Sequence, residues 1–132
     1  MSTGSGNWIR QPKRWAVHVR DGLRCQWCGV VIPDVESYTL DHLRPRSQGG
    51  GHGESNLVTS CHGCNSLRRD MAWWEFASLF PGARGRIERA RRRSIARHRK
   101  MVKRLISSLG YQGAREALIQ EAQERAEAQE MT

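Results

Sequence analysis

The chain has little of the material from which a self-sufficient hydrophobic core is built. Only 38% of its 132 residues are hydrophobic, and two tyrosines and two phenylalanines accompany five tryptophans. A chain of this length with few large apolar residues buries a limited area on folding. We therefore expect one small core with an appendage, stabilised by something in addition to hydrophobic burial.

Long apolar runs are also missing. The sequence contains no uninterrupted stretch of the roughly 18 apolar residues that would span a bilayer, so no transmembrane helix and no membrane partner are predicted. The opening residues, MSTGSGNWIR, lack the apolar segment of a secretory signal. These absences favour a cytoplasmic protein.

Cysteines are few but not scattered. They form two C-x-x-C pairs, Cys25 with Cys28 and Cys61 with Cys64. Without an export signal, this pattern indicates zinc before disulfides. Two pairs complete the tetrahedral four-cysteine set of a structural zinc, which leaves no open position for chemistry. Bound Zn²⁺ would then supply folding free energy. A redox C-x-x-C motif is the alternative, but two pairs are present and no βαβ pattern surrounds either one.

Acidic residues are nearly absent from one segment. Residues 81–109 contain eleven Lys or Arg and one acid, Glu88, so most of the net charge of +9 lies there. Apolar residues recur within it at roughly helical intervals, which predicts a basic amphipathic helix. Gly110 and Gly113 should break that helix before a Glu-rich tail, which forms either a helical hairpin or a frayed end.

Such a basic helix fits a DNA backbone, because Lys and Arg that neutralise phosphates release counterions. We single out Arg91, Arg92 and Arg93 as DNA contacts. A calmodulin-type or membrane-surface helix shows the same pattern, and so does a solvated face packed against the Glu-rich tail.

The order of the remaining elements can be predicted from local patterns. Pro12 suits the first turn of a short helix. Residues 38–43 and 56–59 are predicted strands, separated by a glycine-rich loop, and a helix follows from His62. Pro81-Gly82 marks a boundary, so we divide the chain into residues 1–80, with a core at 25–70, and residues 81–132.

Three motifs lie between or within the cysteine pairs. They are Leu40-Asp41-His42-Leu43-Arg44-Pro45-Arg46-Ser47-Gln48-Gly49-Gly50, then Asn56-Leu57-Val58, and then Cys61-His62-Gly63-Cys64-Asn65. This ordered combination resembles the HNH endonuclease family. The resemblance implies an α+β fold, namely a small ββα-metal core stapled by a four-cysteine zinc site, here with a C-terminal helical extension. It also implies divalent-metal-dependent hydrolysis of DNA that leaves 5′-phosphate and 3′-hydroxyl ends.

Phosphodiester hydrolysis needs a base for the attacking water, and the imidazole of His42 can serve because its ordinary pKa lies near neutrality. Asp41 precedes it on a strand, so its side chain points to the opposite face. The resemblance makes Asp41 and Asn65 ligands of a catalytic Mg²⁺ or Mn²⁺, although the family often has His where this chain has Asn65. It also implies that Asn56 orients His42 by hydrogen bonds.

Arginines beside these motifs could hold phosphates in a bidentate manner. Arg44, Arg46 and Arg68 are the candidates. His52, in the glycine-rich loop, either contacts a phosphate or is merely exposed.

Two other functions remain open at this point. One is a zinc-stabilised DNA-binding protein without catalytic activity. The other is a nuclease whose C-terminal helices bind a protein partner, such as a phage packaging enzyme or a restriction subunit.

Overall fold

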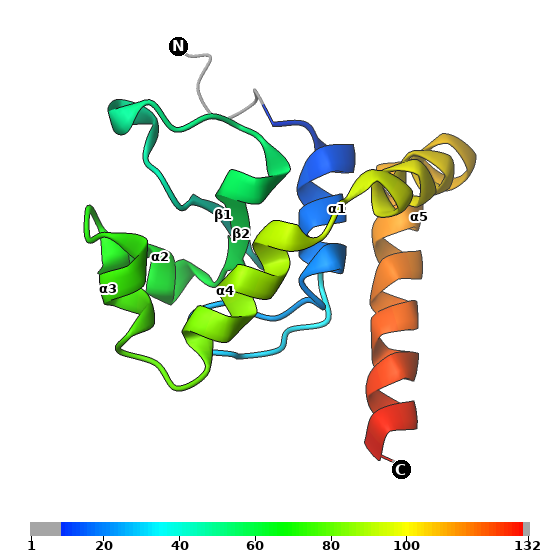
Figure 1. Cartoon of the computed structure of the whole chain (residues 1–132). Coiled ribbons are helices and arrows are strands. Elements are labelled where there is room, and N and C mark those ends of the chain that lie inside the picture. The colour runs from blue at the N-terminus through cyan, green and yellow to red at the C-terminus, as the bar shows by residue number, and fades with distance from the viewer. Residues whose placement is uncertain (1–8, 131–132) are drawn as a thin grey trace.

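The computed structural model describes residues 9–130 (Figure 1). The expectation that no export signal is present concerns the N-terminal residues, and residues 1–8 lie outside this range. No helix among the described residues is long and apolar enough to cross a membrane. The elements follow in the order α1 (Gln11–Arg20), β1 (Thr39–His42), η2 (Arg46–Gln48), η3 (Glu54–Asn56), β2 (Leu57–Ser60), α2 (His62–Arg68), α3 (Trp73–Ala77), α4 (Ala83–Arg92) and α5 (Ala96–Glu130).

The predicted α+β class is confirmed, and its sheet is a single antiparallel pair of β1 and β2. Asp41 lies opposite Val58, and His42 lies opposite Leu57. Every residue of β2 is buried, whereas in β1 only Asp41 is buried. Because side chains alternate along a strand, the sheet directs Asp41 inward and leaves His42 near the surface.

One core cluster surrounds the cysteines. Trp27, Phe76 and Ile87 are completely buried in it together with Cys25, and Cys64 belongs to the same cluster. Trp27 and Phe76 meet edge to face with ring centroids 5.0 Å apart. Helix α4 contributes to this cluster and crosses beside β2 and η3 (Figure 1). The basic helix is therefore also part of the core.

A second cluster joins the two ends of the described chain. Trp15 of α1 and Tyr38 pack there with Val102, Ala114 and Leu118 of α5. Figure 1 shows α5 running alongside α1. Residues after position 80 thus contribute buried side chains to both clusters.

The basic segment is not the single helix that its sequence predicts. Helix α4 ends at Arg92, the next residue is extended (φ −94°, ψ 127°), and α5 begins at Ala96. Between them Ile95 is buried in a third cluster with Val17 and Leu57, and its N–H donates to the Glu54 carboxylate at 2.8 Å. Burial of Ile95 requires the chain to leave the helical path, so the prediction of one helix is wrong.

The expected break at glycine is half right. Helix α5 bends at Gly110, whose φ of 74° lies in the left-handed region that favours glycine. Gly113 continues the helix. The Glu-rich tail is helical to Glu130 and is held by Leu118 in the second cluster, so it is not frayed.

Candidate active site and metal centre

The four cysteines form a site that fits zinc. Their Sγ atoms all lie within 4.8 Å of one another, and Cys28 Sγ is 3.9 Å from Cys61 Sγ. A tetrahedral zinc with Zn–S bonds of about 2.3 Å would separate its sulfurs by about 3.8 Å. Among the described residues, no other group of three or more His, Cys, Asp or Glu side chains could hold a metal ion.

Two local turns bring these sulfurs together. In the first pair, Gly29 adopts a φ of 83° and donates its N–H to the Cys25 carbonyl at 3.0 Å. In the second, Cys61 caps α2, and its Sγ accepts the N–H of Cys64 at 3.4 Å. The zinc site therefore connects the loop after α1 to the helix after the sheet.

His42 lies at the end of β1 and faces the glycine-rich loop. Its Nε2 is 3.0 Å from Nδ1 of His52. Burial lowers the pKa of His42 to about 4, and the nearby charges of His52, Arg46 and Lys13 act in the same direction. His42 is therefore neutral at pH 7, which is the state a general base requires.

His52 is the site residue that the sequence reasoning missed. Its place in a glycine-rich loop predicted either a phosphate contact or simple exposure. The loop instead folds back onto the strand end, so that the two imidazoles meet with ring centroids 5.1 Å apart. The sequence did contain a signal for this contact. The loop that carries His52 connects the two strands of one hairpin, so it must return to the sheet near His42.

Asn56 holds this loop in place. Its Oδ1 accepts the N–H of Arg44 at 2.8 Å, and its Nδ2 donates to the carbonyls of Arg44 at 3.0 Å and Gly51 at 2.9 Å. Each of these three bonds is made to a backbone group. Asn56 thus joins the backbone that follows His42 to the backbone that precedes His52, and its orienting role remains a prediction.

Gly50 makes this arrangement possible. A Cβ atom at this position would lie 1.8 Å from the Arg44 carbonyl oxygen and 3.0 Å from Asn56 Nδ2. No side chain fits such an approach, so the close packing of the two chain segments requires glycine.

The carboxylate of Asp41 is already occupied. Oδ1 accepts from the Arg68 guanidinium at 2.5 Å, and Oδ2 accepts the indole N–H of Trp27 at 3.1 Å. Arg68 also donates to the carbonyls of His42 and Leu43 and is only 3% exposed. A carboxylate that is paired with a buried arginine is not free to coordinate a divalent ion. This geometry therefore does not support the predicted metal-binding role of Asp41.

Arg68 itself differs from its prediction as a DNA contact. Its guanidinium is enclosed and bonded inside the protein, so it cannot face a phosphate in this structure. By contrast, Asn65 is exposed on α2, with its N–H bonded to the Cys61 carbonyl at 3.0 Å.

One comparison with known families matches this region. Residues 25–70 agree with the family described as HNH endonuclease. These residues form an HNH endonuclease domain. The matched range equals the core expected from the sequence, and it runs from the first cysteine pair to the turn after α2. No curated protein matches the chain.

Exposed arginines surround the HNH domain on two sides. Arg44 and Arg46 follow β1, and the charge of Arg46 reaches His42. Arg91 donates to the Ser55 carbonyl at 3.3 Å and lies over the ring of Trp73, which places it beside η3. Arg92 is paired with Glu88 at 4.0 Å, and Arg93 donates to the Arg20 carbonyl at 3.4 Å.

Loss of the Arg68 guanidinium should destabilise the HNH domain strongly. Burial raises the pKa of Asp41 and Arg68 opposes this effect, so Arg68→Met leaves a buried carboxylate without its charged partner. We expect a loss of about 3–5 kcal/mol in the free energy of unfolding, measured by denaturant titration. Arg69→Met is the matched control, because Arg69 is exposed. Equal losses in the two variants would contradict this role.

Proposed function

We propose that the HNH domain hydrolyses DNA phosphodiester bonds in a reaction dependent on Mg²⁺ or Mn²⁺, leaving 5′-phosphate and 3′-hydroxyl ends. The observation that carries the proposal is the neutral, half-buried His42 at the end of β1, 3.0 Å from His52 and within a family-matched nuclease core.

In this proposal, His42 takes the proton of the attacking water. His52 restricts which His42 nitrogen carries a proton, because one ring donates to the other across their contact. Asn56 and Gly50 keep the loop that carries His52 against the strand that carries His42. The base is thereby held in one orientation before DNA arrives, which lowers the entropic cost of the reaction.

The divalent ion is proposed from the family match. Binding at Asp41 and Asn65, as the sequence resemblance implies, would require the ion to displace the Arg68 guanidinium from Asp41. When bound, such an ion polarises the scissile phosphate and stabilises the charge that develops on its oxygens.

The charge distribution supports DNA as the substrate. Arg44 and Arg46 follow β1, and Arg91 lies beside η3, so exposed arginines stand at both ends of the glycine-rich loop. Arg92 and Arg93 follow Arg91 at the end of α4, where Arg92 pairs with Glu88 and Arg93 donates to the Arg20 carbonyl. Guanidinium groups bind phosphate oxygens in a bidentate manner and supply affinity without sequence preference.

Incubation of zinc-loaded protein with supercoiled plasmid and Mg²⁺ or Mn²⁺ tests the proposal. We expect nicked or linear products, none when the catalytic ion is omitted, and nicks that DNA ligase reseals, since ligase requires a 5′-phosphate and a 3′-hydroxyl. Full DNA binding with no cleavage under either ion would instead establish the alternative, a zinc-stabilised DNA-binding protein without catalytic activity.

A further inference from the structure

A second concave site lies away from the histidine pair. It is a pocket of about 160 Å³ between α4 and the segment that runs from the end of α1 to the first cysteine pair. Five arginines line it, namely Arg20, Arg24, Arg86, Arg89 and Arg93. Neither His42 nor His52 lines it, and Arg93 alone among these arginines is also a proposed DNA contact.

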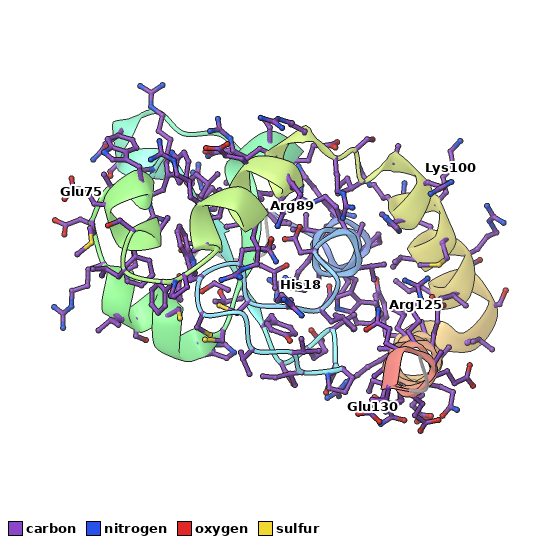
Figure 2. All side chains as sticks on the ribbon, turned by 60° about the horizontal axis from the view of Figure 1, so that its bottom comes forward. His18, Glu75, Arg89, Lys100, Arg125 and Glu130 are labelled. Carbon is purple, nitrogen blue, oxygen red and sulfur yellow. The ribbon has the colours of Figure 1, made fainter. Side chains whose placement is uncertain are left out.

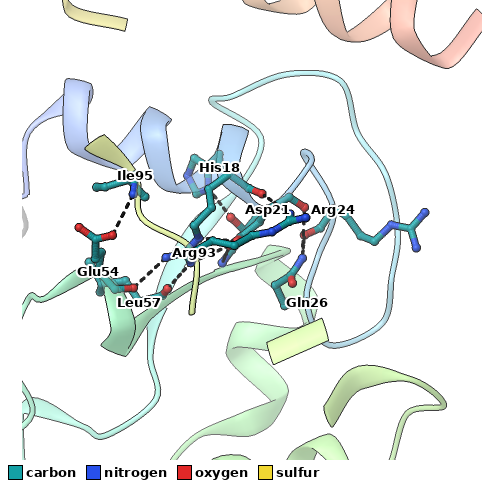
Figure 3. Close-up of polar contacts among 10 residues, drawn as sticks. His18, Asp21, Arg24, Gln26, Glu54, Leu57, Arg93 and Ile95 are labelled. Atoms are coloured by element: carbon teal, nitrogen blue, oxygen red, sulfur yellow. Dashed lines mark hydrogen bonds and ion pairs between the residues drawn. The ribbon is translucent and has the colours of Figure 1, made fainter. Parts of the chain in front are cut away.

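Two of these arginines, Arg20 and Arg86, form hydrogen bonds with the backbone of the pocket walls. Arg20 is buried and pairs with Asp21 at 2.8 Å, while it also donates to the carbonyls of Glu54 and Leu57 (Figure 3). Arg86 donates to the carbonyls of Gln26 and Trp27. These bonds connect α1, β2 and α4 and give the pocket a fixed shape.

Arg89 is different. It lies on the side of α4 that faces α1 (Figure 2) and lines the pocket. Within residues 9–130, the Arg89 side chain forms no hydrogen bond and no ion pair. Its donors are therefore available to a ligand, and two neighbours of the same charge line the pocket with it, Arg86 on α4 and Arg93 directly after that helix.

The charges of the pocket do not cancel. Asp21 is the one acid among the lining residues. Its carboxylate pairs with Arg20 and accepts the N–H of Thr59 at 2.8 Å. Four further arginines line the same cavity. A concave surface lined by one sign of charge concentrates counter-ions, and guanidinium groups match the geometry of phosphate oxygens.

We propose that this pocket binds a phosphoryl group, with Arg89 as its principal ligand and Arg86 and Arg93 beside it. Its source is either the DNA backbone, held outside the cleavage site, or a free phosphate compound. The DNA arm rests on the proposed function, whereas phosphate binding does not depend on cleavage.

Titration of the zinc-loaded full chain with inorganic phosphate, followed by NMR at constant ionic strength, tests the site. We expect saturable shifts at Arg24, Gln26 and Arg89, and an increase of about tenfold in Kd for Arg89→Gln, because a charge-assisted hydrogen bond is lost. Arg84→Gln is the matched control: Arg84 is on the same helix, pairs with Glu88 and does not line the pocket. No saturation in the parent, or equal affinities in the two variants, would overturn the proposal.

Affinity for a short DNA duplex, measured without added Mg²⁺ or Mn²⁺, distinguishes the two sources. If the pocket holds a backbone phosphate, Arg89→Gln weakens DNA binding more than Arg84→Gln and lowers the salt-dependence slope by about 1 relative to that control. If both variants bind DNA equally while only Arg89→Gln loses phosphate, the ligand is a free phosphate compound. Either result is separable from a failure to cleave, since neither measurement requires hydrolysis.

Discussion

Replacement of His42 by alanine should reduce plasmid nicking by at least about a hundredfold, the usual contribution of a general base. His42 is half-buried at the end of β1 with its imidazole against His52, and its lowered pKa keeps it neutral. DNA affinity should stay within about twofold of the parent, because a neutral side chain contributes nothing to counterion release.

Two further variants make this result specific. His52→Ala should lower the rate by less than His42→Ala, because it removes the partner that orients the base and leaves the base itself. His98→Ala is the matched control, since His98 lies on α5, outside the HNH domain. Nicking by His42→Ala at the rate of the parent, with normal DNA binding, would show that another group activates the water.

Removal of zinc should unfold the HNH domain. Structural zinc in small domains contributes an apparent binding free energy of about 10–16 kcal/mol, more than the whole stability of a typical domain. Cys25 and Cys64 belong to the core cluster of Trp27 and Phe76, so loss of the Zn–S bonds that join the two cysteine pairs would open that cluster. We expect chelation to abolish the cooperative thermal transition and to shift the total tryptophan emission, to which the buried Trp27 contributes, toward that of exposed indoles.

Re-addition of ions identifies the metal. Zinc should restore the transition at one ion per chain by metal analysis, and Mg²⁺ should not, because thiolates prefer soft or borderline ions. Cys61→Ser should lose zinc, whereas His62→Ala, an exposed neighbour within the same pair, should keep it. An unchanged melting curve after complete chelation would mean that the four cysteines are not a structural metal site.

Patterns confined to short stretches of sequence were predicted well. The two strands and the helix at Pro12 appear within one or two residues of their expected bounds, because each depends on local alternation or on a proline at a helix start. The expected core, residues 25–70, coincides with the family match. Its motifs are recognisable because each residue type is tied to a fixed local spacing.

Patterns that depend on what the chain folds against were predicted poorly. Helical periodicity over residues 81–109 indicated one basic helix, but Ile95 is buried against β2 and interrupts it. Arg68 was predicted to contact DNA because a guanidinium beside the motifs can hold a phosphate, whereas its partner in the structure is the buried carboxylate of Asp41.

The sequence by itself determined that four cysteines at two-residue spacing surround a hairpin bearing Asp41 and His42, since metal ligands and strand alternation act over a few residues. Only the tertiary structure decided the partners of those side chains: Arg68 for Asp41 and His52 for His42. It also decided which arginines turn inward to line a pocket and which stay in solvent. The physical reason is that burial and charge pairing depend on distances between segments remote in the chain, which local spacing does not encode.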